Sequence, residues 1–278
     1  MPGHRYALGV VGTGHIAMVI LRRLIASEYL SGDRVIVAPS RSLTKHPLDV
    51  AVAFDNAGVV RGSRLIMLSV TPQSFGEAAV SIRDAVAGDH VFISVMAGVP
   101  TERVAEALGG HSVRVVRAMP NLPFELGRGV TGIYRGRHAT LDDMEEVRHL
   151  FGAGGETVEV HEENLMDAVT AVAGSGPAYF YYFVEMMTAG GIAAGLKKED
   201  AQVLAAHACV GAGAMLLQSE ASPAELRAAV TSPGGTTEAA MEKLRASRVA
   251  GHIGDAVVAA FRRSQELGRK AASGPEGG

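Results

Sequence analysis

The segment Gly12-Thr13-Gly14-His15-Ile16-Ala17 follows an apolar run, Tyr6–Val11, and begins an apolar helical stretch. In this G-x-G-x-x-A pattern the first glycine permits a tight turn, the second lets the backbone approach a pyrophosphate, and the small alanine lets helix and strand pack closely. Bare N–H groups at the helix start attract phosphate. Glycine turns also serve ordinary strand-to-helix connections, but this position favours nucleotide binding. The predicted cofactor-binding residues here are Gly12, Gly14, His15, Ile16 and Ala17.

The next β-rich run ends in Val37-Ala38-Pro39-Ser40-Arg41-Ser42, which contains no carboxylate. An acid at this point would bind a ribose 2′-hydroxyl, whereas hydroxyls and a guanidinium suit a 2′-phosphate. Ser40 and Arg41 are therefore candidate phosphate ligands, and a solvated surface arginine is the alternative for Arg41. We predict NADPH as the cofactor, with NADH as the alternative.

A second glycine-bearing segment, Thr231-Ser232-Pro233-Gly234-Gly235-Thr236-Thr237, precedes the helical stretch Glu238–Leu244. A proline and two glycines here place bare N–H groups and hydroxyls at a helix start, which suits a substrate carboxylate. In the alternative interpretation this is an ordinary capped turn, and its threonines serve only the backbone.

The chain lacks the basic catalysts of several dehydrogenase classes. No lysine lies between Lys45 and Lys197, and no Tyr-x-x-x-Lys pattern occurs. Alcohol oxidation of the short-chain type is therefore disfavoured. Reduction of a protonated imine fits better, because the nitrogen carries its own proton and hydride adds to carbon without a strong general acid.

The cysteine and histidine content gives little basis for a metal site. The single Cys209 excludes a disulfide framework and a cysteine-based metal site, and it fits a reducing cytoplasm. The ten histidines are scattered, the nearest cluster being His161-Glu162-Glu163, and no His-x-x-x-His occurs. We therefore predict no metal.

Strand-like runs alternate with helical stretches in the first part of the chain, and many of these runs are apolar without polar alternation, as in strands covered on both faces. The runs are Tyr6–Val11, Arg34–Ala38, Arg64–Val70, His90–Ser94 and Arg114–Met119, with Val130–Tyr134 and Glu156–Val160 as weaker candidates. This alternation predicts an α/β, Rossmann-like domain with a mostly parallel, doubly wound sheet. After about His161 helical periodicity and alanine predominate, which predicts an all-α domain. The expected division is residues 1–161, 162–270 and a flexible tail, 271–278.

Charge and hydropathy restrict the partners. Lysine plus arginine is 26 and aspartate plus glutamate is 29, a net charge of −3, which lacks the basic excess that nucleic-acid binding requires. Ala168–Leu196 is apolar enough to span a bilayer, but Glu185 and the run Gly174-Ser175-Gly176-Pro177 favour a core or subunit-interface helix. No signal peptide is recognisable at the N-terminus. We expect a cytoplasmic protein without nucleic-acid or membrane partners.

Several motifs in both halves resemble those of the Δ1-pyrroline-5-carboxylate reductase family, which reduces a cyclic imine in proline biosynthesis. The most specific is the segment of residues 231–237. The supporting motifs are Ala173-Gly174-Ser175-Gly176-Pro177-Ala178-Tyr179, Met119-Pro120-Asn121, Ala97-Gly98-Val99 and Val70-Thr71-Pro72-Gln73. The resemblance implies an oxidoreductase that uses NAD(P) and acts on a small cyclic imino acid. It also implies a homodimer or higher homo-oligomer that associates through its helical domain and completes its active site between subunits.

The same resemblance implies roles for individual residues. Thr237 would hydrogen-bond the ring nitrogen, and Glu220 would be an acid near that nitrogen, its alternative being a surface glutamate. The other implied substrate-binding residues are Ser232, Gly234, Gly235, Thr236 and Asn121. Outside the Gly12–Ala17 segment, which we call the glycine elbow, the implied cofactor-binding residues are Asn56, Val70, Thr71, Pro72, Ala97 and Gly98.

The sequence also departs from the family. Thr71 stands where the family usually has lysine, Leu122 stands where it has threonine, and the stretch Ala246–Ile253 lacks the usual Gly-Gly-Phe-Arg. A more apolar pocket edge would suit a related or substituted cyclic imino acid of specialised metabolism. A second alternative, from another class, is a catalytically inactive nucleotide-binding scaffold.

Overall fold

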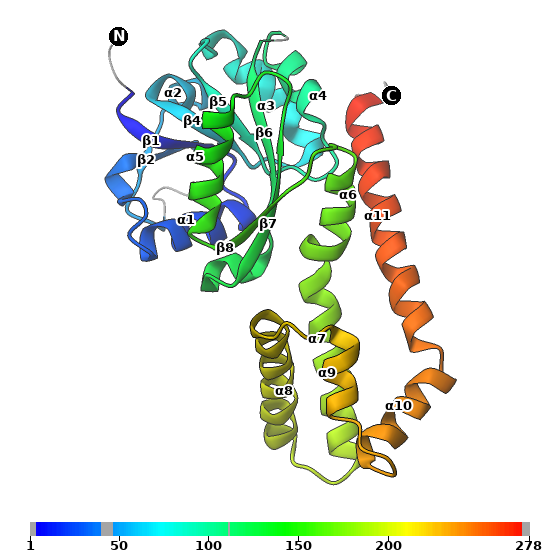
Figure 1. The fold of residues 1–278 in the computed structure, drawn as a ribbon. Helices are drawn as coiled ribbons and strands as arrows, with labels where there is room; N and C mark the ends of the chain where they lie inside the picture. Colours follow the sequence, from blue (N-terminus) through cyan, green and yellow to red (C-terminus); the bar gives the residue numbers. More distant parts are fainter. Residues whose placement is uncertain (1–3, 40–46, 111, 274–278) are drawn as a thin grey trace. The chain divides into compact units, whose positions relative to one another are not determined.

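The computed structural model describes residues 4–39, 47–110 and 112–273. The chain forms two compact units (Figure 1). Met1–Ser175 and Ala260–Gly278 make the first unit, and Gly176–Ala259 make the second. The first holds the sheet, and the described part of the second is helical.

An eight-stranded sheet in the order β3-β2-β1-β4-β5-β6-β7-β8 forms the centre of the first unit. Its strands are β1 (Tyr6–Val11), β2 (Val35–Val37), β3 (Ala51–Val52), β4 (Ser63–Leu68), β5 (Val91–Ser94), β6 (Arg114–Met119), β7 (Gly129–Arg135) and β8 (Gly155–Glu159). Neighbouring strands are parallel except β6 and β7. The predicted fold class is therefore confirmed.

Two details of the sheet differ from the predicted strands. β3 is only two residues long, so it has no apolar run that sequence patterning could detect. β7 turns back against β6 because the connection, residues 120–128, is shorter than the dozen or so residues that a parallel crossover needs. A 3₁₀ segment, Leu122–Leu126, makes this turn, and Gly127 ends it with φ +68°.

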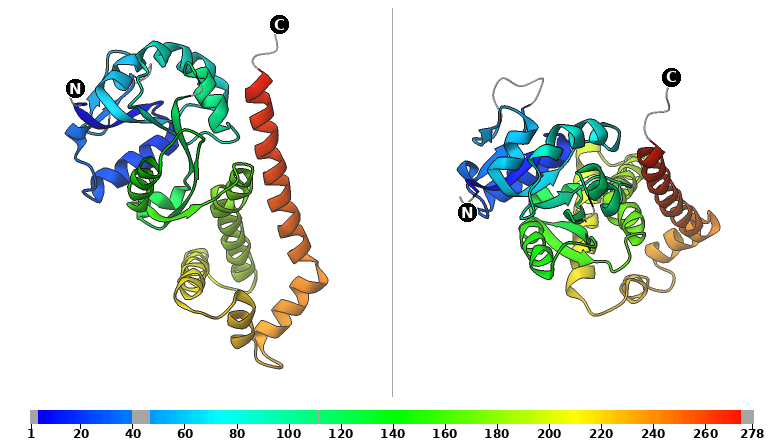
Figure 2. Two further views of the ribbon diagram at one scale, coloured as in Figure 1. Left: turned by 45° about the horizontal axis from the view of Figure 1, so that its top comes forward. Right: turned by 90° about the horizontal axis from the view of Figure 1, so that it is seen from above.

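Helices cover both faces of the sheet (Figure 1, Figure 2). On one face, α1 (His15–Ala26) and α5 (Leu141–Gly152) bury apolar side chains against strand residues such as Leu8 and Met67. On the other, α2 (Asn56–Gly62), α3 (Phe75–Ile82) and α4 (Thr101–Ala107) pack against Val11, Ile66 and Phe92. Covering both faces explains the apolar strands, since each fully buried large side chain contributes about 1.5–3 kcal/mol.

The remaining elements of the first unit are short, apart from the end of a long C-terminal helix. Three further 3₁₀ segments are Gly32–Arg34, Pro72–Ser74 and Arg83–Ala85. α6 (Leu165–Val169) continues into a π-helical segment, Thr170–Gly174, which interrupts the apolar stretch expected over 168–196. Both contact β7, so the first unit extends to Ser175. The domain boundary predicted from the sequence, between residues 161 and 162, marks where strands give way to helices along the chain. It is defined differently from the boundary between compact units and stays a prediction.

The second unit consists of α7 (Gly176–Ala193), α8 (Lys198–Gln218), α9 (Pro223–Ala229), α10 (Thr236–Ala246) and the first part of α11 (Val249–Ser273). α11 is one continuous helix whose residues from 260 onward belong to the first unit. It includes residues 271–273, which we expected in the tail.

α7 and α8 contact each other but are little covered by the rest of the chain. Within them only Gly176, Ala201 and Ala205 are buried. α8 is also long and apolar enough to cross a membrane by length and composition, the single such helix among the residues with a described structure, which is weak evidence for a span. Apolar helices exposed to this extent need a further partner surface.

Candidate dinucleotide and substrate sites

The order in which successive strands are added to the sheet reverses between the neighbouring strands β1 and β4. From β1 it proceeds outward through β2 to β3, and β4, β5 and β6 follow on the other side of β1. The loops after the carboxyl ends of β1 and β4 therefore flank a topological switch point, where doubly wound sheets bind ligands. Gly12 and Ser69 lie in these two loops.

Gly12 forms the turn between β1 and α1 with φ +93°, a conformation that residues with a Cβ rarely adopt. A Cβ at Gly12 would lie 2.7 Å from the carbonyl carbon of Ser69 and the amide nitrogen of Val70. Gly14 is the N-cap of α1, and no side chain caps this helix start. The first turn of α1 carries no acidic residue, so its N–H groups and positive dipole end favour an anion.

The other residues of the elbow also have environments that suit a bound dinucleotide. Gly14 and His15 are exposed, Ile16 is half-buried against the core, and Ala17 is fully buried. The small Ala17 thus allows α1 to pack closely on the sheet. Ser40 and Arg41, predicted to bind the 2′-phosphate, lie outside the described residues.

The loop after β4 contributes a hydroxyl that sequence reasoning missed. The Ser69 Oγ is buried and has no hydrogen-bond partner among the residues that the structure describes. A buried hydroxyl without a partner is costly, so it marks a place where a bound molecule could supply one. Its position between β4 and the predicted site residue Val70 is the sequence signal that could have indicated it.

Thr71 and Asn56 both use their side chains within the fold. Thr71 accepts a hydrogen bond from the Ser74 amide at 3.3 Å and thereby caps the 3₁₀ turn that starts at Pro72. The Asn56 Nδ2 donates to the Ser81 Oγ at 2.9 Å, which ties α2 to α3. Thr71 is exposed and Val70 and Pro72 are half-buried, at the same edge of the sheet as Gly12.

Ala97 and Gly98 follow β5 and differ in exposure. Ala97 is half-buried, whereas Gly98 is buried with φ +75°. A Cβ at Gly98 would lie 2.6 Å from the Gly268 amide nitrogen and 2.7 Å from the Ser264 carbonyl oxygen. Gly98 therefore has a packing role that requires glycine, because α11 approaches the loop backbone directly.

Asn121 is buried, and both ends of its amide are engaged. Its Nδ2 donates to the Ala173 carbonyl at 3.1 Å, and its Oδ1 accepts from the Val130 amide at 3.0 Å. Asn121 thus links β7 to the π-helical segment. One N–H of Nδ2 and one lone pair of Oδ1 are not used by these two bonds. Binding of substrate by this amide, as expected from the sequence, stays a prediction.

The Ser232–Thr237 segment in the second unit forms a turn that leads into α10. Gly234 has φ +71°, and the Gly235 amide donates to the Ser232 carbonyl at 3.0 Å. α10 begins at Thr236, two residues earlier than the predicted stretch, because Gly235 and not a later residue is the N-cap. Thr236 and Thr237 therefore lie in the first helical turn.

The N–H groups of this turn are not all bare. The Gly234 amide donates to the Glu238 Oε2 at 2.7 Å, a contact that sequence reasoning missed although an acid in a first helical turn is a recognisable capping signal. The Thr237 side chain is half-buried and makes no hydrogen bond to any described residue. Glu220 is exposed after the end of α8.

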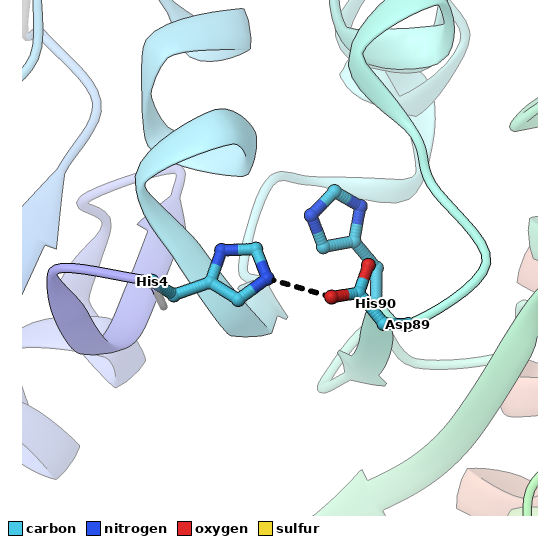
Figure 3. Close-up of side chains that lie close together, drawn as sticks. All are labelled: His4, Asp89 and His90. Atoms are coloured by element: carbon cyan, nitrogen blue, oxygen red, sulfur yellow. Dashed lines mark hydrogen bonds and ion pairs between the residues drawn. The ribbon is translucent and has the colours of Figure 1, made fainter. Parts of the chain in front are cut away.

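The sheet also assembles a histidine cluster that the sequence spacing hides. His4, Asp89 and His90 come together at the amino ends of β1 and β5, and the His4 Nε2 lies 3.0 Å from the Asp89 Oδ2 (Figure 3). The His90 Nδ1 accepts from the Ala87 amide at 2.9 Å. In the neutral ring the other nitrogen then carries the proton and is a donor, not a metal ligand. The cluster lies at the sheet edge opposite the Gly12 turn.

Fold and glycine elbow together define a protein of the Rossmann-type, dinucleotide-binding class, joined to a helical unit with large exposed apolar surface. Comparison with known families makes this more specific. The family model described as pyrroline-5-carboxylate reductase dimerisation matches residues 163–267, and that described as NADP oxidoreductase, coenzyme F420-dependent, matches residues 7–98.

Relatives of known name match nearly the whole chain. The pyrroline-5-carboxylate reductase of Synechocystis sp. is 38% identical over 267 residues, 95% of this chain and 98% of that protein. The Pisum sativum pyrroline-5-carboxylate reductase is 35% identical over 265 residues, 94% of this chain and 96% of that protein. The chain belongs to the pyrroline-5-carboxylate reductase family.

Solved structures agree with this assignment. A pyrroline-5-carboxylate reductase from Coxiella burnetii has a TM-score of 0.85 at 31% identity and covers 95% of this chain and 99% of its own. A Plasmodium falciparum pyrroline carboxylate reductase with NADP bound has a TM-score of 0.87 at 24% identity, covering 96% and 100%, and supports the fold. The family resemblance inferred from the sequence motifs is therefore confirmed, and the dimerisation match supports a homo-oligomer.

Proposed function

We propose that this protein reduces the cyclic imine Δ1-pyrroline-5-carboxylate to L-proline with NADPH. The observation that carries the proposal is the retained Ser232–Thr237 turn, with an unpartnered Thr237 hydroxyl in the first turn of α10, in a chain of this family. A cofactor elbow alone would fit many oxidoreductases. The turn adds a binding place for a small anion: its N–H groups suit a carboxylate, and the Thr237 hydroxyl suits a nitrogen next to that carboxylate.

The residues of the first unit fit a dinucleotide. The Gly12 turn leaves no room for a Cβ, and the uncapped start of α1 offers N–H groups to the pyrophosphate. Val70, Thr71, Pro72 and Ala97 would line the ribose and nicotinamide end, with the Ser69 hydroxyl as an additional donor. When bound, NADPH supplies the hydride that the imine carbon accepts.

On the substrate side, the turn at residues 232–237 would hold the carboxylate through backbone N–H groups and the hydroxyls of Ser232 and Thr236. Thr237 would hydrogen-bond the ring nitrogen and aim the imine carbon at the nicotinamide. Its contribution is orientation, because the protonated nitrogen needs no further proton when hydride adds to carbon. Glu220 would stabilise the positive nitrogen from a greater distance.

We infer a preference for NADPH over NADH from the segment Pro39–Ser42, which offers hydroxyls and a guanidinium and no carboxylate. An arginine pairs with a 2′-phosphate through charge-assisted bonds, whereas NADH offers only a hydroxyl there. Steady-state oxidation of both nicotinamides tests this. A kcat/KM at least tenfold higher with NADPH supports the inference, and equal values would reject it.

The catalytic proposal is tested by Thr237→Ala, with Thr237→Ser as its matched control. Thr237→Ala should lower kcat about tenfold to a hundredfold, because only the positioning hydrogen bond is lost, and should leave the NADPH dissociation constant unchanged. Thr237→Ser keeps the hydroxyl and should retain most activity. Equal activity of the alanine variant would contradict the assigned role. Absence of NADPH oxidation with imino acid in the unmodified protein would favour the inactive scaffold.

A second candidate substrate is a substituted or larger cyclic imino acid. Leu122, at the start of the turn between β6 and β7, is 42% exposed, and it presents an apolar side chain in a connection at the carboxyl end of β6. An apolar edge lowers the cost of placing a ring substituent there. Turnover of five-membered, six-membered and methylated imino acids separates the candidates. A strong preference for the unsubstituted five-membered ring rejects the second.

We further propose that the protein acts in the cytoplasm as a homodimer or larger homo-oligomer, without nucleic-acid or membrane partners. The net charge of −3 and the dimerisation match support this view. The exposed apolar faces of α7 and α8 would then meet the same helices of a second copy and not lipid.

A further inference from the structure

The buried guanidinium of Arg117, on β6, takes no part in the function proposed above. Arg117 is 3% exposed. Its Nη1 lies 3.7 Å from the Glu163 Oε1, and its Nη2 lies 3.6 Å from the Asp167 Oδ1. Burial lowers the pKa of Arg117, and the two carboxylates oppose this by favouring the charged form. A charge is retained inside a domain only where such partners compensate its desolvation.

Glu163 connects this charge cluster to the loop after β5. It accepts from the Thr101 amide at 2.6 Å and from the Thr101 Oγ1 at 2.9 Å. Thr101 begins α4 and lies three residues after Gly98. The carboxylate of Glu163 therefore holds the end of the loop that contains Ala97 and Gly98.

Asp167 connects the same cluster to α11. The Ser264 Oγ donates to the Asp167 Oδ1 at 2.6 Å, and Ser264 is 3% exposed. One helical turn further on, Gly268 meets the backbone of Gly98, where a Cβ on either glycine would collide with the other residue. The segment 264–268 of α11 thus packs on the loop, and Asp167 secures it.

We propose that Arg117, Glu163 and Asp167 are positioning residues that hold the Ala97–Gly98 loop from two sides, through Thr101 and through α11, and so fix the nicotinamide end of the bound cofactor. The inference rests on the proposed function, which assigns Ala97, the neighbour of Gly98, to that end. The elbow at Gly12, which would bind the pyrophosphate, makes none of the contacts in this cluster.

Two variants test the α11 arm of the cluster. Asp167→Asn keeps the size and an acceptor for Ser264 but removes the charge opposite Arg117. Gly268→Ala leaves every charge in place and puts a methyl group against the Gly98 carbonyl. Both should lower kcat about fivefold to thirtyfold and weaken NADPH binding severalfold. Neither should change the affinity for 2′,5′-ADP, which carries the adenine end of the cofactor without a nicotinamide.

The matched control is Glu159→Gln. Glu159 on β8 pairs with the Arg148 Nη2 on α5 at 2.6 Å, within the same unit, and its ion pairs with described residues do not involve the loop. This variant should keep kcat and the ratio of NADPH to 2′,5′-ADP affinity within twofold of the unmodified protein. Ser264→Ala is a milder variant of the α11 arm, and it should show the same signature as Asp167→Asn if the latter folds poorly.

Two results would overturn the proposal. One is an unchanged affinity ratio and kcat in both Asp167→Asn and Gly268→Ala. The other is an equal loss of NADPH and 2′,5′-ADP affinity, which indicates a general structural role. Because the affinity ratio needs no turnover, it still tests the positioning role if the protein proves inactive on pyrroline-5-carboxylate. Failure of the unmodified protein to bind NADPH would reject the proposed function and this inference together.

Discussion

His90 illustrates how a single side chain acquires its chemistry from residues distant in the sequence. The residue is 3% exposed. Between ring centroids, it lies 5.3 Å from His4 and contacts Phe92 edge-on at 6.2 Å. Burial lowers the pKa of His90 most, Asp89 raises it, and His4 and Arg114 lower it further. The neutral ring is then favoured in the folded protein, consistent with its acceptor role toward Ala87.

This lowered pKa makes stability depend on pH. The unfolded chain binds a proton to His90 at about pH 6.5, whereas the folded chain resists it, so stability falls as the pH decreases below about 6.5. His90→Asn keeps an acceptor near Ala87 but does not titrate. We expect this variant to show a smaller loss of Tm between pH 7.5 and 5 than the unmodified protein. His149→Asn, at an exposed histidine of α5, is the control and should lose as much Tm between pH 7.5 and 5 as the unmodified protein does.

At the scale of elements, the turn between β1 and α1 shows why backbone geometry and ligand binding are linked. Gly12 permits both the left-handed φ and the close approach of the Ser69 and Val70 backbone. In α5, by contrast, Thr140 and Asp143 form a capping box that satisfies the helix start internally. α1 lacks such a cap, so its N–H groups remain for a ligand.

Gly12→Ala should affect both stability and binding. The positive φ and the contacts at 2.7 Å predict a loss of about 1–3 kcal/mol in the free energy of unfolding. NADPH affinity should fall at least tenfold because the turn must shift. Urea unfolding and fluorescence titration with NADPH measure the two effects. Gly152→Ala, at a helical glycine with open space, should change stability by less than about 1 kcal/mol and leave binding intact. Equal stability and equal NADPH affinity of the two variants would contradict the role of Gly12 in cofactor binding.

For the whole molecule, the exposed faces of α7 and α8 are the main feature that one chain does not explain. Phe180, Tyr181 and Tyr182 on α7 are about 60% exposed, and Leu217 on α8 is 85% exposed. Apolar area removed from water contributes about 25 cal/mol per Å². Together with the dimerisation match over residues 163–267, this exposure supports the proposal that α7 and α8 meet a second copy.

Phe180→Glu should therefore break the homo-oligomer. A charge in place of a 62% exposed aromatic residue becomes a buried, unpaired charge in the assembly, so it should shift the protein to monomers and lower its Tm. Sedimentation velocity measures the mass. The control Val80→Glu replaces an apolar residue of similar exposure, 65%, on α3 of the first unit and should leave the mass unchanged. An intact oligomer in Phe180→Glu would show that this face is not the interface.

The sequence by itself determined those features that depend on residues close together along the chain. The bounds of β1 agree with the predicted run because a stretch of apolar residues marks a strand covered on both faces. The bounds of β6 agree as well, although two arginines interrupt its apolar residues. The Gly12 elbow and the Ser232–Thr237 turn were recognisable for a similar reason, since the need for glycine arises from local backbone geometry.

Only the tertiary structure decided which distant residues meet. The His4–Asp89–His90 cluster, the direction of β7, the engagement of Asn121 and the contacts of Arg117 with Glu163 and Asp167 join residues up to 86 positions apart. No periodicity encodes such pairs, because strand order and helix packing bring them together only after the chain has folded. For that reason the Gly98–Gly268 contact, which carries the positioning inference, could not be read from either glycine alone.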